Sequence, residues 1–358
     1  MRQGIRQYQV PALWPHHAPG FVEDRAARVA AVGKSRQDPS VVHFFDCADV
    51  GRTLVSYGRR VGYYWRYRPA LAPGLGGTLS PGAFQSRYNI VSWRIRRTVE
   101  ALRADLMHVH FGTRGGVANS RPVIPFVMHW HGTDIREPQF RPNVQWGADH
   151  AAAVVYSTPD LRKHAEPVRP DAVYLPNPVD WAELPAWSPA GPPRVVFASR
   201  WEDSKGGAEQ LKVAAAIRDV TQGRVVLEGL DWGNMAEEAR ALGVRLVPRM
   251  PKPEYLRWMS GAHCVVGQSA GILAMSELQA LSMGVPVVMN LGEGYYVDAP
   301  VLDGDGPEGL AAQALHALED PLAASAQANA RAWVEKYHGP DAAVEKLAGI
   351  YRGVMAGL

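Results

Sequence analysis

The 358-residue chain lacks several features that define whole classes of protein. Its two cysteines, Cys47 and Cys264, are too few for a disulfide-stabilised scaffold or a cysteine-rich zinc module. No apolar run reaches the roughly 18 residues of a transmembrane helix, and residues 1–10 lack the long apolar core of a secretory signal. Low-complexity tracts are absent as well. We therefore expect a folded, cytoplasmic protein.

Acidic residues are missing from one stretch. Between Gly51 and Val99 there are nine arginines and no Asp or Glu. Residues 1–180 carry 23 Lys and Arg against 14 Asp and Glu, a net charge of +9, whereas residues 181–358 carry 15 against 21, a net charge of −6. This asymmetry indicates that the first half faces something anionic.

Short apolar runs alternate with helical stretches along the chain. Uninterrupted Val, Ile, Leu and Phe are typical of parallel strands covered by helices on both faces. We expect strands at 41–45, 106–109, 124–128, 153–156, 172–175, 194–198, 224–227, 244–247, 263–266 and 285–289. The expected helices are 86–103, 206–220, 253–260, 274–283, 308–319, 321–337 and 340–355. The order predicts an α/β protein with two doubly wound, Rossmann-like domains.

A proline-rich segment suggests the domain boundary. Residues 184–193 contain four prolines, which suits a stiff linker between a first domain at 1–185 and a second at 190–335. The last helix has an apolar stripe but no strand after it. We therefore expect residues 340–358 to pack back onto the first domain.

One strand-to-helix turn carries two cations. Arg200 and Lys205 stand five residues apart, directly before Gly206 and Gly207. Two cations neutralise a diphosphate, and glycines allow it to approach a helix N-terminus. Solvated loop charges are the alternative interpretation, because glycine-rich turns are common.

A second turn leads into a helix that carries one carboxylate. Backbone amides near Leu273 and Ala274, at the start of this helix, can hold a phosphate. Glu277 lies about one turn further on, where it can accept hydrogen bonds from ribose hydroxyls. The alternative is that Glu277 merely stabilises the first turn of the helix.

Together these segments resemble the retaining GT-B glycosyltransferases of family 4, the group 1 glycosyl transferases. The matching segments are Ser199–Gly206, Glu277–Val288, Tyr174–Asp180, His129–Asp134 and His108–Gly112. The resemblance therefore runs from about residue 105 to the end of the chain. It implies a GT-B fold, in which two Rossmann-like domains face each other across a cleft.

The resemblance also implies an activity. A sugar would move from a nucleotide-sugar donor, with a UDP-sugar favoured, to an acceptor with retained anomeric configuration and without a metal or other cofactor. Arg200 and Lys205 would hold the diphosphate, and His131 would reach the transferred sugar. The remaining donor-binding residues would be Gln268, Ser269, Gly271, Leu273 and Ala274, with Glu277 at the ribose and Arg249 near the base.

Two departures from the family pattern leave other functions open. Ser269 stands where the family has the glutamate that meets the donor sugar, so either Gln268 substitutes for it or the sugar is held differently, and the identity of the donor sugar stays open. The family's Gly-Gly loop after the first strand is missing, unless Pro19-Gly20 serves in its place. A GT-B sugar-nucleotide epimerase and a nucleotide-sugar-binding protein without turnover are the alternatives.

The acceptor side is predicted from Asp134 and from a segment that mixes aromatics with Arg59, Arg60, Arg66 and Arg68. Such a segment can bind phosphate or carboxylate, or meet an anionic membrane surface. We expect an anionic small-molecule or lipid-linked acceptor, with peripheral membrane contact and no nucleic acid. A neutral acceptor and a solvated basic face are the alternatives.

Two H-x-H pairs invite a metal interpretation. His108 and His110, like His129 and His131, occupy alternate strand positions and so share a face. Four imidazoles could converge on zinc, but no carboxylate or cysteine completes an obvious set. We therefore expect no metal, and packing or hydrogen bonding for three of the four.

Overall fold

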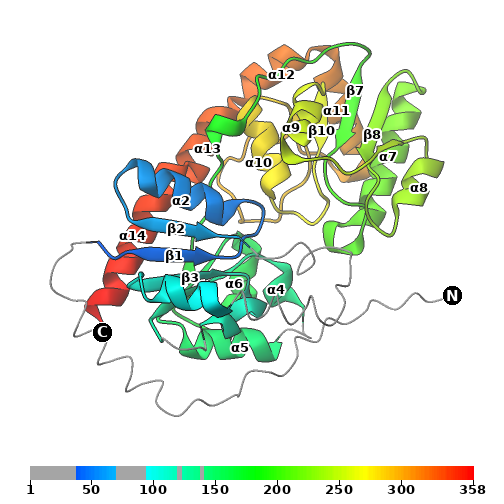
Figure 1. Cartoon of the computed structure of the whole chain (residues 1–358). Coiled ribbons are helices and arrows are strands. Elements are labelled where there is room, and N and C mark those ends of the chain that lie inside the picture. Colours follow the sequence, from blue (N-terminus) through cyan, green and yellow to red (C-terminus); the bar gives the residue numbers. More distant parts are fainter. Residues whose placement is uncertain (1–37, 70–93, 119–122, 138–140) are drawn as a thin grey trace. The chain divides into compact units, whose positions relative to one another are not determined.

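The computed structural model describes residues 38–69, 94–118, 123–137 and 141–358 (Figure 1). These residues form two compact α/β units. Unit 1 takes the described residues up to Ser157, together with Leu161–Leu175 and Val344–Leu358. Unit 2 consists of Thr158–Asp160 and Pro176–Ala343.

Unit 1 is built on a six-stranded sheet in the order β2-β1-β3-β4-β5-β6, with every pair parallel. Its strands are β1 (Val41–Phe44), β2 (Trp65–Arg68), β3 (Leu106–His110), β4 (Phe126–Trp130), β5 (Ala153–Tyr156) and β6 (Val173–Tyr174). Its helices are α2 (Val50–Arg60), α4 (Thr133–Arg136), α5 (Arg141–His150), α6 (Arg162–Ala165) and most of α14 (Pro340–Ala356), and residues 94–101 are also helical. The order changes direction between β1 and β3, which is the switch point of this sheet.

The two faces of this sheet differ in chemistry. One face is apolar, with Phe44, Met107 and Met128 in a single buried cluster. Alternate residues of the same strands point to the opposite face. That face carries buried histidines, and Tyr351 of α14 packs against them.

Unit 2 has a five-stranded parallel sheet in the order β11-β10-β7-β8-β9. Its strands are β7 (Arg194–Phe197), β8 (Val226–Leu230), β9 (Arg245–Val247), β10 (Cys264–Val266) and β11 (Val287–Val288). Its helices are α7 (Gly207–Thr221), α8 (Ala236–Ala241), α9 (Lys252–Ser260), α10 (Met275–Met283), α11 (Gly306–Glu319), α12 (Pro321–Ala328) and α13 (Ala330–His338). The switch point lies between β7 and β10. Apolar side chains cover both faces of the sheet.

The predicted α/β class and each predicted strand are confirmed. Two predictions need correction. Residues 65–68, where the sequence predicts no strand, form the edge strand β2. The single helix expected at 321–337 is two helices, because Asn329 adopts the left-handed conformation (φ 44°) and ends α12.

The proline-rich segment 184–193 lies within unit 2. The indole nitrogen of Trp187 donates to the carbonyl of Ala262 at 2.8 Å, and the amide of Ser188 donates to the carbonyl of Ser260 at 3.0 Å. The long segment of unit 2, Pro176–Ala343, begins directly after Leu175.

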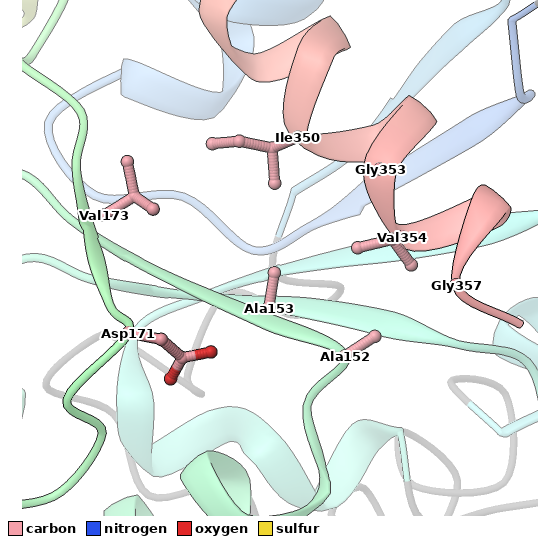
Figure 2. A pocket seen from close by; sticks show the side chains of 8 residues that line it. All are labelled: Ala152, Ala153, Asp171, Val173, Ile350, Gly353, Val354 and Gly357. Carbon is pink, nitrogen blue, oxygen red and sulfur yellow. The ribbon is translucent and has the colours of Figure 1, made fainter.

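A hollow of about 320 Å³ lies beside α14 in unit 1 (Figure 2). Ala153 and Val173, at the starts of β5 and β6, face Ile350 and Val354 across it. It therefore lies at the amino edge of the sheet, whereas ligands of parallel sheets bind at the carboxyl edge. Among the described helices, none combines the length and apolarity needed to cross a bilayer.

Candidate functional site

The fold brings the two predicted donor segments to one edge of the unit 2 sheet. Residues 198–206 follow β7, and residues 267–274 follow β10. Because β7 and β10 flank the switch point, their carboxyl ends border the crevice in which open α/β sheets bind ligands. The sequence motifs thus coincide with the position that topology favours for a ligand.

The two loops contact each other through their backbones. The amide of Ser269 donates to the carbonyl of Lys205 at 3.0 Å. Gly206 has a φ of 69°, and a Cβ there would lie 2.8 Å from the carbonyl carbon of Ser269. Only glycine therefore permits this approach. Gly206 is also the N-cap of α7 and provides no capping side chain, and the amides of Gly206 and Gly207 donate to the carbonyls of Asp203 and Glu202 at 3.0 Å. The positive end of the α7 dipole lies beside Lys205.

Trp232, which the sequence analysis missed, links two of the predicted cations. The guanidinium of Arg200 lies 4.9 Å from the centroid of its ring, and that of Arg249 lies 4.1 Å from it. Arg200 also pairs with Glu202 at 2.9 Å. Trp232 is 37% exposed and comes two residues after β8. An aromatic residue just beyond a parallel strand was the signal that could have found it.

Glu277 is fully buried and shapes the loop before α10. Its carboxylate accepts hydrogen bonds from the amide of Gln268 at 3.0 Å, the amide of Ala274 at 3.0 Å and the hydroxyl of Ser276 at 2.9 Å. The amide of Leu273 donates to the hydroxyl of Tyr296 at 3.0 Å. Both amides predicted to hold a phosphate therefore donate to side chains of this chain.

The same loop leaves one buried acceptor without a partner. Gln268 is fully buried, and its Nε2 donates to the carbonyl of Ile272 at 3.0 Å. Its Oε1 has no hydrogen-bond partner among the described residues. Gly271 has a φ of 74°, and its carbonyl accepts from the amide of Gly292 at 2.8 Å. An unsatisfied buried acceptor costs about 1–3 kcal/mol of stability, so Oε1 of Gln268 is a candidate to accept a hydrogen bond from a ligand.

In unit 1, Asp134 positions the loop that carries His131. Its fully buried carboxylate accepts from the amides of Gly112 at 2.7 Å, Gly132 at 2.7 Å and His131 at 3.1 Å. Burial raises the pKa of Asp134. Gly132 has a φ of 143°, which disfavours other residues. Asp134 thus ties the loop after β4 to the loop after β3.

The predicted histidines converge on one face of the sheet and are joined by His43 of β1, which the sequence analysis missed. Burial lowers the pKa of each of the five, to about 3 for His43 and His131. The ring nitrogens of two overlapping triads, His43/His108/His110 and His110/His129/His131, lie within 4.8 Å of one another. The cluster is therefore neutral, and its geometry could accept a metal ion.

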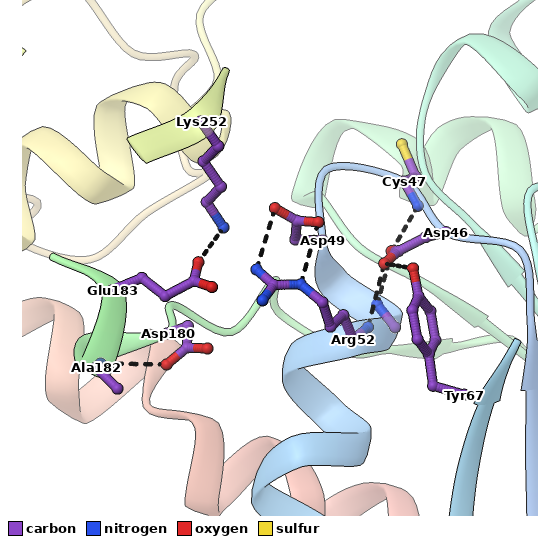
Figure 3. A network of polar contacts seen from close by, with 10 residues as sticks. Asp46, Cys47, Asp49, Arg52, Tyr67, Asp180, Ala182, Glu183 and Lys252 are labelled. Atoms are coloured by element: carbon purple, nitrogen blue, oxygen red, sulfur yellow. Dashed lines mark hydrogen bonds and ion pairs between the residues drawn. The ribbon is translucent and has the colours of Figure 1, made fainter. Parts of the chain in front are cut away.

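The loop after β1 contains a carboxylate at a helix N-terminus (Figure 3). Asp46 accepts from the amides of Gly51 at 2.8 Å and Arg52 at 3.2 Å, and from the hydroxyl of Tyr67 at 2.8 Å. This loop has no Gly-Gly pair, and Phe45, Ala48 and Asp49 take positive φ values in it. The proposed substitute, Pro19-Gly20, lies outside the described residues. A resident carboxylate therefore occupies the anion-attracting end of α2.

The structure does not gather the four predicted arginines around His131. Arg66 and Arg68 both pair with Glu100, with Nε–carboxylate distances of 2.8 and 2.7 Å, and the Glu100 side chain is only 6% exposed. Arg59 and Arg60 are exposed at the end of α2, just before the chain enters β2. They lie at the amino edge of the sheet, opposite the edge that carries His131.

Neither a family model nor a curated protein matches the chain, but solved structures do. A glycosyltransferase from Rickettsia africae superposes with a TM-score of 0.63 at 12% identity, over 89% of this chain and 99% of that one. HepE from Anabaena, solved with UDP and glucose, gives 0.62 at 13% identity, over 87% and 99%. AviGT4, a glycosyltransferase involved in avilamycin A biosynthesis, gives 0.59 at 20% identity, over 89% and 99%.

TarM from S. aureus is similar over a smaller part. It gives a TM-score of 0.56 at 12% identity over 69% of this chain, and the chain spans 55% of TarM. At these identities the likeness shows the fold alone. The chain has the GT-B fold, with a Rossmann-like sheet in each unit.

Proposed function

We propose that the chain is a glycosyltransferase that transfers a sugar from a nucleotide-sugar donor, a UDP-sugar, with retention of configuration as in family 4. The observation that carries the proposal is the backbone contact between Lys205-Gly206 and Ser269 at the switch point of the unit 2 sheet. It joins the loop with the two cations, which leads into the N-terminus of α7, to the loop before α10. The solved complexes of HepE with UDP and with UDP-glucose support this choice of donor.

The donor diphosphate lies against Arg200, Lys205 and the N-terminus of α7. These groups neutralise the negative charge that develops on the leaving nucleotide, which is the largest electrostatic need of the reaction. Arg249 and Trp232 lie on the side of the base. The charge at this site comes from side chains and backbone dipoles, so the proposed reaction requires no metal ion.

The loop from Gln268 to Ala274 meets the sugar and the second phosphate. A sugar hydroxyl would satisfy the unpaired Oε1 of Gln268. The amide of Leu273 would exchange the Tyr296 hydroxyl for a phosphate oxygen. Glu277 supports this loop from beneath through its bonds to the amides of Gln268 and Ala274. In unit 1, neutral His131 contacts the transferred sugar through a hydrogen bond.

Calorimetric titration of UDP, GDP, ADP and UDP-glucose into the full chain tests the donor. We expect UDP and UDP-glucose to bind, and Arg200→Ala and Lys205→Ala to weaken binding at least tenfold. Arg218→Ala is the matched control, because Arg218 lies in the last turn of α7 and pairs with Asp219. If no nucleoside diphosphate binds to the wild type, the proposal is wrong.

Product analysis tests the reaction. UDP release is measured over a panel of acceptors, and the anomeric configuration of the product is read from its proton coupling. Retained configuration is expected, and inversion would contradict the family 4 mechanism. A changed sugar that stays nucleotide-bound without an acceptor would indicate an epimerase. Tight UDP binding without any transfer would indicate a binding protein.

A further inference from the structure

Five histidines and Tyr351 form one hydrogen-bonded chain within unit 1. One arm starts at His131, whose Nε2 lies 3.0 Å from Nδ1 of His110. The Nε2 of His110 lies 3.1 Å from Nδ1 of His43, and the Nε2 of His43 lies 3.1 Å from the hydroxyl of Tyr351. This arm connects the half-buried His131 to α14.

The second arm starts at the same hydroxyl. The oxygen of Tyr351 lies 2.7 Å from Nδ1 of His108, and the Nε2 of His108 lies 3.1 Å from Nδ1 of His129. There the chain stops, because Nε2 of His129 is buried and has no partner among the described residues. Tyr351 is therefore the point at which the two arms meet.

Each histidine in this chain is a neutral imidazole. His43, His108, His110 and His129 have no exposed surface, and burial lowers the pKa of all five rings. A neutral imidazole has one N–H donor and one lone pair. Every ring that bonds through both nitrogens must donate with one and accept with the other.

This requirement couples the tautomers of all five rings. If the single Tyr351 proton points to His108, the ring pairings require every histidine to carry its proton on Nε2. If it points to His43, every histidine must carry its proton on Nδ1. Any mixture would place two N–H groups, or two lone pairs, against each other in at least one bond.

The ends of the chain decide between the two states. The Nε2–H state leaves a buried N–H of His129 without an acceptor, whereas the Nδ1–H state leaves only a lone pair there. Orphaned buried N–H groups are rarer in proteins than under-satisfied acceptors. The Nδ1–H state is therefore favoured, and it makes Nδ1 of His131 a hydrogen-bond donor. Because the row of hydrogen bonds ends at the unpartnered Nε2 of His129, it can fix the tautomers of the rings but cannot carry a proton onward.

Gly51 provides room for this arrangement. A Cβ at this position would lie 2.8 Å from Nε2 of His110, the atom that bonds to His43. A side chain at position 51 would therefore displace the central ring of the first arm.

We propose that Tyr351 is a positioning residue that, through His43 and His110, holds His131 as the Nδ1–H tautomer, so that His131 donates a hydrogen bond to a substrate oxygen. The identity of that substrate rests on the proposed function, whereas the coupling of the tautomers does not.

The test is ¹⁵N NMR of the histidine rings in the ligand-free full chain. We expect Nδ1–H signals for all five rings in the wild type. Tyr351→Phe keeps the ring and removes the hydroxyl, so His131 should then populate both tautomers. Tyr63→Phe is the control, because it removes a different hydroxyl that bonds to Glu345 of α14. Gly51→Ala leaves the five histidines and Tyr351 in place, and His131 should populate both tautomers in this variant as well.

Two further readouts keep the outcomes distinguishable. In the transfer assay, Tyr351→Phe should lower kcat about tenfold and leave the donor KM unchanged. A wild type with mixed or Nε2–H signals would overturn the proposal, as would an unchanged His131 in both Tyr351→Phe and Gly51→Ala. Stoichiometric Zn²⁺ binding that shifts the ring nitrogen signals would overturn it too, because the lone pairs that accept hydrogen bonds between the rings would then bind the metal. Failure of UDP binding would contradict the proposed function without changing the NMR result.

Discussion

The two units present candidate sites at the same edge of the same kind of sheet, but the site in unit 2 is cationic and the site in unit 1 is neutral. In unit 2, Arg200 and Lys205 follow β7, which borders the switch point, and Arg249 follows the edge strand β9. In unit 1, the corresponding edge carries buried, neutral histidines. Topology thus determines where each site forms, whereas the side chains decide whether it neutralises charge or directs hydrogen bonds.

The helix N-termini show the same contrast at closer range. Two helices begin beside resident carboxylates, α2 beside Asp46 and α10 with Glu277. The N-cap of α7 is a glycine with no side chain to accept a bond. The amides of Gly206 and Gly207 donate to backbone carbonyls, so the attraction of α7 for an external anion comes from its dipole, which no capping side chain neutralises.

The largest expected effect is the loss of kcat when a cation is removed from the charged site of unit 2. Arg200→Ala and Lys205→Ala should each raise the activation barrier by about 2–4 kcal/mol, which is a loss of roughly 30- to 1,000-fold in kcat. The reason is that each change removes a cation from the leaving diphosphate. Steady-state kinetics beside Arg218→Ala would check this, and near-normal kcat in either variant would count against the diphosphate role.

The second prediction is that the buried histidines of unit 1 make the folded protein less stable at acid pH. The unfolded chain protonates its histidines near pH 6.5, whereas burial holds the folded-state pKa of His43 and His131 at about 3. Stability that is fully present above pH 6.5 is therefore lost as the pH falls toward 3, by up to about 1.4 kcal/mol per pH unit for each histidine. The raised pKa values of Asp46 and Asp134 act in the opposite sense, because these carboxyl groups take up protons more readily in the folded state than in the unfolded state.

Denaturant unfolding at pH 7.5, 6.5 and 5.5 measures this slope. His110→Phe should reduce it by about one histidine's share, whereas His316→Gln, which changes an exposed histidine of α11, should not. A free energy of unfolding that does not change with pH over this range would show that the rings take up protons as readily in the folded state as in the unfolded state.

The third prediction compares the two resident carboxylates. Glu277→Gln puts an NH₂ group where an oxygen accepts bonds from backbone amides, so it should cost about 1–3 kcal/mol of stability and raise the donor KM. Asp46→Asn should cost a similar amount in stability and leave the donor KM unchanged, because Asp46 lies in unit 1. Equal effects of the two changes on donor KM would contradict the proposal that the donor is bound by unit 2.

Short sequence patterns predicted those elements of the fold whose burial is visible within a few consecutive residues. Strands buried on both faces appear as apolar runs, so each predicted strand is present. The edge strand β2 was not predicted, because Trp65 is its only fully buried residue. Arg66 and Arg68 pair with Glu100, which lies more than 30 residues away in the sequence. No short sequence window contains that pairing.

The candidate site shows the same division. The loops after β7 and β10 could be predicted, because glycines, cations and a carboxylate lie close together in the sequence. His43 could not, since it is a single histidine in an apolar run and its hydrogen-bond partners lie 67 and 308 residues away. Trp232 was missed for the same reason, because both arginines that contact it lie on other loops.

The smallest expected effect concerns the basic segment of unit 1. Arg59 and Arg60 are exposed, whereas Arg66 and Arg68 share Glu100. If the acceptor is anionic, Arg59→Gln/Arg60→Gln should raise its KM by no more than about threefold at low salt, because exposed charges contribute only a few tenths of a kcal/mol each. The difference should vanish near 1 M salt, where the Debye length is about 3 Å.

Arg66→Gln/Arg68→Gln should behave differently. It leaves the nearly buried Glu100 without its cations, so it should lower the melting temperature and leave the salt dependence of acceptor KM unchanged. The measurement is acceptor KM from low to high salt in wild type and both double variants. A KM that does not change with salt in the wild type would exclude an anionic acceptor steered by unit 1, since long-range attraction between charges must weaken as ions screen it. The proposed donor site of unit 2 would be unaffected by that outcome, because its cations would act on the diphosphate at contact distance.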